Sequence, residues 1–363
     1  MTLRKVNISI LTVTVVIFLL VLHHNFLGLS DFLKRELSDS NSLGLQPIDF
    51  IPAAPQRLAD ERNDKEISVV IAASDERLGG AIAAMNSIYR HTRSNVVFHI
   101  VTLNDTVEHL RLWLSNTALK NLRYRILDFD PRVLEGKVQV DPQKADTLKP
   151  LTFARFYLPN LVPHAEKAIY VDDDIIVQDD ILELYNTPLK PGHAAAFSDD
   201  CDSTTNKVAA RGAGSRYKYI RFLDYKKETI RKLAIKANTC SFNPGVFVQL
   251  EKWMALNAVM TLWIPVIEEL YSRTLSGSIT TPPLLIVFYK KHSSIDPMWN
   301  VRHLGSSGGK RYSPQFVKAA KLLHWSGHFK PWGRTASYAE VWVKWYVPDP
   351  TGKFRLIHRH LET

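Results

Sequence analysis

Three consecutive carboxylates, Asp172, Asp173 and Asp174, end an apolar run in the segment AIYVDDDIIVQ at residues 168–178. In extended backbone, successive side chains point to opposite sides, so we expect Asp172 and Asp174 to face one way and Asp173 the other. An Asp-x-Asp pair offers oxygen ligands to one divalent cation, which would also relieve the repulsion among the carboxylates. Aspartates also commonly end strands and begin turns, so this segment alone leaves both a metal site and a turn open.

A second segment with chemically useful residues is LLHWSGHFKPWGR at residues 322–334. His324 can ligate a metal ion, Gly327 allows close approach of the backbone to a ligand, and Lys330 can neutralise phosphate charge. Taken singly, the three are equally typical of a core histidine, a turn glycine and a solvated lysine. Together with the aspartates they predict a site that holds a diphosphate through a divalent cation and a lysine.

The elements that must position these residues follow an alternating pattern. Short apolar runs rich in β-branched residues predict buried strands at residues 67–74, 95–103, 123–129 and 167–174. Between them, apolar residues at helical spacing predict helices at residues 77–92 and 106–121. Such alternation predicts an α/β fold with a doubly wound, mostly parallel sheet, in which ligands bind beyond the carboxyl ends of the strands. The aspartates lie at such an end.

In this order, the segments resemble glycosyltransferase family 8 from about residue 67 to about residue 357. The resemblance implies a nucleotide-sugar-binding fold of the GT-A type. It implies a UDP-sugar as donor, Mn²⁺ or another divalent cation as cofactor, and transfer of a hexose-type sugar with retention of configuration. The acceptor, whether a glycan, a lipid or a protein, is not identified by the sequence.

The resemblance also assigns individual roles. The motif IAASDER would contact the uridine, TFARFYLP carries the arginine that would reach the donor sugar and phosphate, and FNPGVFV carries the asparagine beside the transferred sugar. The residues implied in donor binding are Ala72, Ser74, Asp75, Glu76, Arg155, Asp173, Asn243, Gly327 and Lys330. The implied metal ligands are Asp172, Asp174 and His324, and the implied catalytic residues are Arg155, Asp174 and Lys330.

Two stretches depart from the family pattern. Many members carry an Asp-Gln pair next to the reacting sugar carbon, where this chain has Thr281 and Pro282 in GSITTPPLLIVFY. The stretch after Val248 carries Pro265 within a helical pattern, which predicts a break or kink near Trp263. The departures keep a second hypothesis open, a catalytically silent luminal protein that binds UDP or a glycan without turnover.

The N-terminus predicts a membrane anchor. Residues 6–22 carry no charge and follow Arg4 and Lys5, as in a short span with a cytoplasmic N-terminus. A cleaved signal peptide is the alternative, although no small-residue cleavage pattern follows the run. The predicted organisation, of a type II protein of the Golgi or endoplasmic reticulum, is a tail at 1–5, an anchor at 6–27, a luminal stem at 28–66 and a luminal catalytic domain at 67–363.

Three further features bear on the compartment and the partners. Asn104 begins an Asn-x-Thr sequon, and Cys201 and Cys240 could pair in an oxidising lumen or remain free thiols. The net charge of +10 does not indicate a nucleic-acid partner, because the lysines and arginines are scattered and no RNA-binding signature occurs. We expect the positive charge to favour anionic nucleotide sugars or acidic glycans instead.

Overall fold

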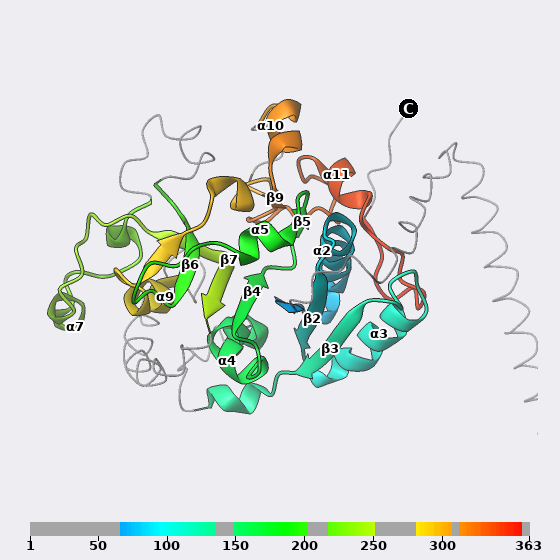
Figure 1. Cartoon of the computed structure of the whole chain (residues 1–363), viewed down its shortest axis with the longest axis horizontal. Coiled ribbons are helices and arrows are strands. Elements are labelled where there is room, and N and C mark those ends of the chain that lie inside the picture. The colour runs from blue at the N-terminus through cyan, green and yellow to red at the C-terminus, as the bar shows by residue number, and fades with distance from the viewer. Residues whose placement is uncertain (1–65, 136–148, 202–216, 251–280, 307–311, 358–363) are drawn as a thin grey trace, which may run out of the picture. The chain divides into compact units, whose positions relative to one another are not determined.

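The protein is described by a computed structural model for residues 66–135, 149–201, 217–250, 281–306 and 312–357. Within these residues, a seven-stranded sheet has the order β3-β2-β1-β4-β7-β6-β8 (Figure 1). A separate two-stranded sheet pairs β5 with β9. The strands are β1 (Glu66–Ala72), β2 (Asn95–Thr102), β3 (Arg123–Asp128), β4 (Lys167–Val171), β5 (Ile175–Val177), β6 (Ala195–Asp199), β7 (Phe242–Leu250), β8 (His292–Ser294) and β9 (Leu322–His324).

Short helices connect these strands. The α-helices are α2 (Leu78–His91), α3 (Asn104–Ser115), α4 (Leu158–Leu161), α5 (Ile181–Tyr185), α7 (Glu228–Lys232), α9 (Thr281–Val287), α10 (Pro314–Ala319) and α11 (Ala339–Val343). The 3₁₀ helices are η2 (Asp75–Arg77), η3 (Pro131–Leu134), η5 (Pro150–Tyr157), η6 (Tyr219–Arg221) and η8 (Pro297–Asn300).

The large sheet is covered on both faces, as the continuous apolar run of β1 predicts. Ile67, Val69 and Ile71 pack into a core with α2 and α3, whereas Val70 packs into a second core with residues of η5, α4 and α9. This alternation follows from the period of two along a strand. Two layers therefore enclose the sheet, and the carboxyl ends of its parallel strands are left to form a rim.

The sheet is mostly parallel on one side and mixed on the other. Strands β1, β2, β3 and β4 run parallel, while β7 runs antiparallel to both β4 and β6. Because Val171 at the end of β4 pairs with Val246 near the start of β7, the first residues of β7 lie at the same rim as the aspartates. The small sheet brings in a distant segment, because Ile175 of β5 pairs with His324 of β9.

The strands predicted at 67–74, 95–103 and 123–129 are confirmed within one or two residues at each end. The strand before the aspartates is shorter than predicted, because β4 ends at Val171 and the three aspartates lie in a bend before β5. Here the chain leaves the large sheet for the small one. The Asp172 N–H donates to the carbonyl oxygen of Gly245 at 2.8 Å, and the carbonyl oxygen of Asp174 accepts from the Trp325 N–H at 2.8 Å.

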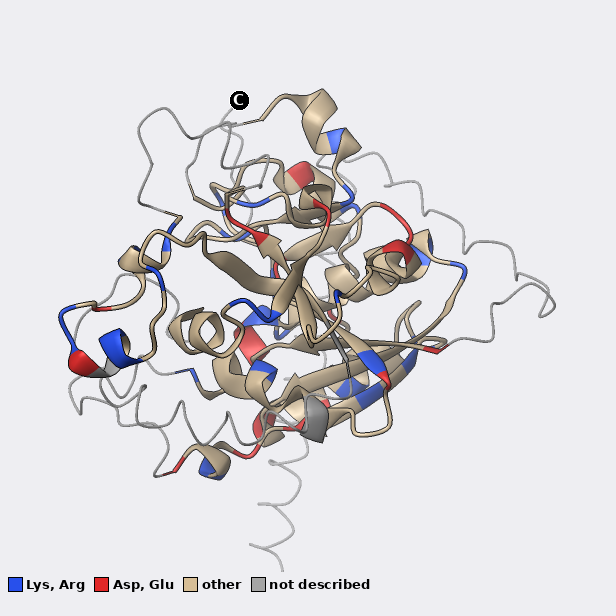
Figure 2. Cartoon of the chain, turned by 60° about the vertical axis from the view of Figure 1, so that its left-hand side comes forward, with Lys and Arg blue, Asp and Glu red and all other residues tan. Residues whose placement is uncertain are grey.

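Several predictions fall outside the described residues. The tail, anchor and stem at residues 1–65 do so, as does the expected kink near Trp263. Across the parts of the chain that the structure describes, no helix has the length and apolar character needed to cross a membrane. In the view of Figure 2, the lysine and arginine positions are spread over the visible elements and interspersed with aspartate and glutamate positions, which agrees with the scattered charge of the sequence.

Cys201 and Cys240 form a disulfide, with their Cα atoms 5.8 Å apart. The bridge links the end of β6 to the residues before β7, and it spans 39 positions of sequence. The disulfide therefore restrains the chain immediately before the first residues of β7, which lie at the rim.

We expect the double variant Cys201→Ser/Cys240→Ser to unfold at a lower temperature than the parent. A crosslink across a loop of this length limits the unfolded chain by an amount equivalent to about 4 kcal/mol in the loop-entropy model. Thermal unfolding followed by circular dichroism measures the loss. A reducing agent should lower the melting temperature of the parent and leave that of the double variant unchanged; an equal response of both proteins would contradict a stabilising bridge.

Candidate active site

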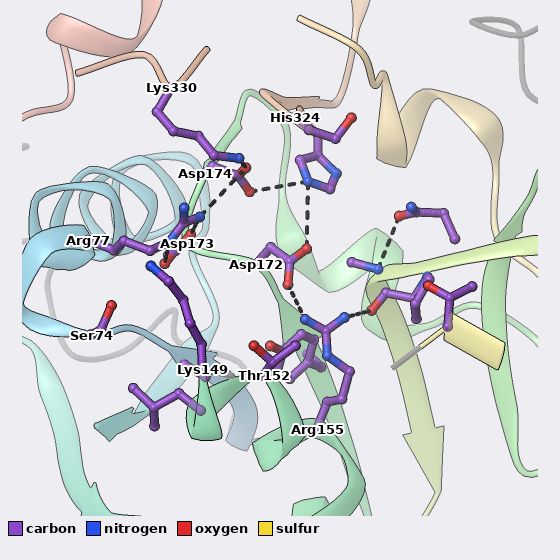
Figure 3. A pocket seen from close by; sticks show the side chains of 18 of the residues that line it. Ser74, Arg77, Lys149, Thr152, Arg155, Asp172, Asp173, Asp174, His324 and Lys330 are labelled. Atoms are coloured by element: carbon purple, nitrogen blue, oxygen red, sulfur yellow. Dashed lines mark hydrogen bonds and ion pairs between the residues drawn. The ribbon is translucent and has the colours of Figure 1, made fainter. Parts of the chain in front are cut away.

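A cavity of about 500 Å³ opens at the rim of the large sheet (Figure 3). Its walls come from the end of β1, η2, η5, the bend after β4, the start of β7, α9 and the loop after β9. Lys330 and His324 approach the aspartates from one side and Arg155 approaches from the opposite side (Figure 3). The rim therefore gathers acids, cations and a histidine in one hollow.

Asp172, Asp174 and His324 form the centre of this site. His324 Nε2 lies 3.2 Å from Asp174 Oδ1 and 3.7 Å from Asp172 Oδ2, and one ligand atom from each residue lies within 4.8 Å of the others. Asp174 and His324 are each only 2% exposed. Asp174 Oδ1 is buried and accepts no hydrogen bond. A buried carboxylate oxygen without a hydrogen-bond donor, next to an imidazole nitrogen and a second carboxylate, fits the donor set of a Mn²⁺-like cation.

Each of the three aspartates also has a basic partner. Lys330 Nζ donates to Asp174 Oδ2, and Arg155 Nη2 donates to Asp172 Oδ1 at 2.9 Å. Arg77 binds Asp173 through two nitrogens, with Nε 2.5 Å from Oδ2. The arginine also lies over the ring of Trp332, with its Cζ 5.4 Å from the ring centroid. Asp173 is thus directed away from His324, while the aspartates on either side of it face the histidine.

Neighbouring groups control the charge of Asp174. Burial by itself raises the pKa of this carboxyl group, but His324, Lys330 and Arg77 outweigh it and hold the pKa well below its usual range. Asp174 is therefore ionised at neutral pH even though it is buried. An ionised carboxylate is the form that a metal ion requires.

Two glycines, Gly245 and Gly327, allow the residues around the cavity to pack closely. A Cβ atom at Gly245 would lie 2.5 Å from Asp172 Oδ2 and 2.6 Å from His324 Cε1. Gly327 has a φ of +122°, and a side chain there would also collide with the backbone of Gly305. Any other residue at either position would displace the parts of the chain that line the cavity.

The chain was compared with known proteins. The model of the family described as "Glycosyl transferase family 8" matches residues 68–336, which include every element of the cavity. The chain belongs to glycosyltransferase family 8. Glycosyltransferase 8 domain-containing protein 1 of Bos taurus is 69% identical, over 100% of this chain and 99% of its own length, and that of Homo sapiens is 67% identical with the same coverage. Glycosyltransferase 8 domain-containing protein 2 of Bos taurus is 46% identical, over 82% of this chain and 87% of its own.

Solved structures support the fold. The galactosyltransferase LgtC, in complex with donor and acceptor sugar analogues, aligns with a TM-score of 0.56 at 18% identity. The alignment covers 79% of this chain and 100% of LgtC. The bifunctional glycosyltransferase WbbM aligns with a TM-score of 0.56 at 18% identity, over 80% of this chain and 51% of WbbM. The family 8 chain thus has the α/β fold of the GT-A type that its sequence predicts.

The structure brings together most of the residues that the resemblance to family 8 implied. Those that line the cavity are Ala72, Ser74, Glu76, Arg155, Asp172, Asp173, Asp174, Asn243, His324, Gly327 and Lys330. Asp75 is the exception, and its assignment to donor binding stays a prediction that the cavity does not support. Its carboxylate lies 2.6 Å from His109 Nδ1 and 2.9 Å from Lys353 Nζ, outside the cavity lining. Asn104, the predicted glycosylation site, is exposed at the first residue of α3.

Some lining residues were missed by sequence reasoning. Arg77 immediately follows the donor motif, and Gly245 lies inside FNPGVFV, so position alone could have indicated both. Lys149, which lies 2.8 Å from Glu76 at the mouth of the cavity, had no such signal. Neither did Asn300, which does not line the cavity but lies behind it against His324.

Proposed function

We propose that this chain is a metal-dependent, retaining glycosyltransferase that moves a hexose-type sugar from a UDP-sugar to an acceptor hydroxyl. Membership of family 8 supports glycosyl transfer. The single observation that carries the finer proposal is the meeting of Asp172, Asp174 and His324 around the buried, unsatisfied Asp174 Oδ1. A divalent cation held by these three residues would supply Lewis-acid neutralisation of a diphosphate.

Lys330 and Arg155 would stabilise the departing diphosphate. Both are already fixed next to the proposed metal ligands, Lys330 on Asp174 and Arg155 on Asp172. Arg155 is further held by its Nη1 donating to the carbonyl oxygen of Pro244 at 3.0 Å. Because these cations are positioned before any ligand arrives, they need little reorganisation as charge develops on the leaving group.

Retention without a covalent intermediate is the route that we propose. A double displacement needs a carboxylate nucleophile beside the anomeric carbon. Among the described residues that line the cavity, the carboxylates are Glu76, Asp172, Asp173 and Asp174, and each forms an ion pair. Thr281, where many members of the family carry the first residue of an Asp-Gln pair, lines the cavity as a neutral side chain. We therefore favour attack by the acceptor on the face that UDP leaves, with a phosphate oxygen taking the acceptor's proton.

The silent binding protein is the second candidate, and the neutral Thr281 is the observation in its favour. Such a protein would still hold UDP through the same cluster. It would differ from the enzyme only in releasing no UDP from a UDP-sugar.

We also propose that the chain is a type II membrane protein of the Golgi or endoplasmic reticulum with its catalytic domain in the lumen. The uncharged residues 6–22 after Arg4 and Lys5 support an anchor. The disulfide between Cys201 and Cys240 and the exposed Asn104 are compatible with an oxidising lumen.

The full-length chain, purified in detergent, should release UDP from one of the common UDP-sugars when Mn²⁺ is present. We expect UDP release to stop when a chelator removes the metal and to return on addition of excess Mn²⁺, because the bound cation would neutralise the diphosphate leaving group. Enzyme-coupled detection of UDP, with each donor tested separately, is the measurement. Mn²⁺-dependent UDP binding without release from any donor, even with acceptor mixtures added, would favour the silent protein. Trapping a covalent glycosyl-enzyme would overturn same-face attack.

A further inference from the structure

A chain of hydrogen bonds connects the backbone of β7 to the ring of His324, on the side of the ring opposite Asp172 and Asp174. We propose that Asn300 is a positioning residue that holds His324 in the tautomer with its proton on Nδ1, so that the Nε2 lone pair faces Asp172 and Asp174. The inference rests on the proposed function, because it concerns how the same cluster receives a divalent cation.

The first step fixes the amide of Asn243. The backbone N–H of Gly245 lies 3.0 Å from Asn243 Oδ1. A backbone N–H is only a donor, so the side-chain atom that faces it is the carbonyl oxygen and not the amide nitrogen. The usual ambiguity in the orientation of an asparagine side chain is therefore resolved by a group that cannot change its role.

The second step carries that orientation to Asn300. Asn300 Nδ2 lies 3.0 Å from Asn243 Oδ1, so Asn300 donates to an oxygen that is already identified as an acceptor. Its other side-chain atom, Oδ1, then faces His324 Nδ1 at 2.9 Å. Asn300 is fully buried. A flipped amide would place two oxygens against each other at Asn243 and lose a buried hydrogen bond.

The third step fixes the histidine. An amide oxygen at Nδ1 only accepts, so Nδ1 must carry a proton. In the neutral ring the lone pair then lies on Nε2, which is 3.2 Å from Asp174 Oδ1 and 3.7 Å from Asp172 Oδ2. This is the nitrogen that can ligate a cation shared with the two aspartates.

The backbone around Asn300 is fixed against the same strand as the histidine. The next residue, Val301, donates to the carbonyl oxygen of Leu322 at 2.9 Å and accepts from the His324 N–H at 2.9 Å. Asn300 is the last residue of η8, which is capped by Asp296, whose Oδ1 accepts from the Met298 N–H at 2.9 Å. These backbone hydrogen bonds place the segment of Asn300 directly beside β9, which carries His324.

Mn²⁺ alone is the probe that tests this proposal, because it needs no donor, acceptor or turnover. Full-length chains in detergent would be titrated with Mn²⁺, and the free ion would be measured by its electron paramagnetic resonance signal. We expect Asn300→Leu to weaken Mn²⁺ binding by about 10- to 100-fold, the usual effect of losing a hydrogen bond to a metal-bound histidine. Asn300→Asp should stay within about threefold of the parent, because one carboxyl oxygen still accepts from Nδ1–H and the other, when protonated, donates to Asn243 Oδ1 in place of the amide.

Asn86→Leu is the matched control. Asn86 lies on α2 and donates from Nδ2 to the carbonyl oxygen of Trp345 at 2.9 Å, away from the cluster. The variant removes an asparagine hydrogen bond from the same domain and should leave Mn²⁺ affinity unchanged. Melting temperatures without metal would show whether each variant is folded.

Parent-like affinity in Asn300→Leu would overturn the proposal, and so would an equal loss in Asn300→Asp and Asn300→Leu. If Asn300→Leu does not fold, Asn300→Asp and the tautomer of the parent still decide. In ¹⁵N-histidine spectra of the neutral ring, with the His324 signal identified by its loss in His324→Gln, we expect a proton on Nδ1, and a proton on Nε2 alone would refute the inference. A parent chain that binds no Mn²⁺ would count against the proposed function, while the tautomer would still test the role of Asn300.

Discussion

The Asp174→Ala variant is expected to lose Mn²⁺-dependent UDP binding. Asp174 contributes the buried oxygen that accepts no hydrogen bond, and its other oxygen holds Lys330 in place. Its removal leaves His324 and Asp172 as the remaining ligands and takes the principal carboxylate partner from Lys330. Truncating one member of a buried charge pair in a binding site costs about 2–5 kcal/mol, which corresponds to about a 30- to 5,000-fold loss of affinity.

Calorimetric titration of UDP in the presence and absence of Mn²⁺ measures this loss directly. A second readout is the melting temperature, because a metal that binds only the folded state stabilises it by about 2.7 kcal/mol at a free concentration 100 times the dissociation constant. We expect Mn²⁺ to raise the melting temperature of the parent and to have no effect on Asp174→Ala. Asp174→Asn keeps the shape of the side chain and should behave like the alanine variant, because the metal requires the charge.

Asp349→Ala is a matched control for Asp174→Ala. The Asp349 side chain is also buried and also pairs with a histidine, at 2.8 Å from His109 Nε2, but it does not line the cavity. Both variants should lose stability, and only Asp174→Ala should lose metal-dependent UDP binding. Retained Mn²⁺ dependence in a folded Asp174→Ala protein would remove Asp174 from the metal site and with it the central element of the proposed function.

Local sequence patterns predicted the first three strands of the sheet and the alternation of strands with helices. The apolar runs gave the first three strands and the order of strand and helix, because burial on both faces of a parallel sheet leaves a continuous apolar signature. The same logic placed the aspartates at the rim, although the strand ends with its apolar run at Val171 and does not include the aspartates, as the prediction at 167–174 did. The pairing of Ile175 with His324 joins segments almost 150 residues apart. No periodicity encodes such a register, so the two halves of the cluster were connected only by the chemistry of their residues and by the resemblance to a family.

The individual side chains of the site were predicted unevenly for a related reason. Asp75 sits in the right turn, but its side chain points to His109 and Lys353, a direction that depends on the packing of α3 and the C-terminal segment. Asn300 is equally invisible in the sequence, because its role comes from two hydrogen bonds to residues 57 and 24 positions away. Motifs indicate which residues approach a ligand, whereas the residues that orient them are identified by three-dimensional geometry.

A second large loss of metal binding is expected for Gly245→Ala. The backbone of Gly245 does not have a positive φ, so alanine is compatible with the local conformation. Its Cβ, however, would lie 2.5 Å from Asp172 Oδ2, 2.6 Å from His324 Cε1 and 3.0 Å from Asn243 Oδ1. One methyl group would thus push apart Asp172 and His324, two of the proposed metal ligands, and would also displace Asn243, which orients Asn300. Since metal sites tolerate displacements of about 0.2 Å, we expect Mn²⁺ affinity to fall by at least about 10-fold, as measured by titration of the full-length chain.

Gly79→Ala is the control that separates a general effect of overpacking on stability from the specific loss of Mn²⁺ binding in Gly245→Ala. Gly79 lies in the first turn of α2, away from the proposed metal ligands. A Cβ atom there would collide with the ring of Phe354. Overpacking costs about 1–3 kcal/mol of stability, so both variants should melt at lower temperatures than the parent. Only Gly245→Ala should lose Mn²⁺ affinity, because only its methyl group enters the space between Asp172 and His324. If Gly245→Ala binds Mn²⁺ as tightly as Gly79→Ala, then Asp172 and His324 do not bind a common ion, even though both line the cavity.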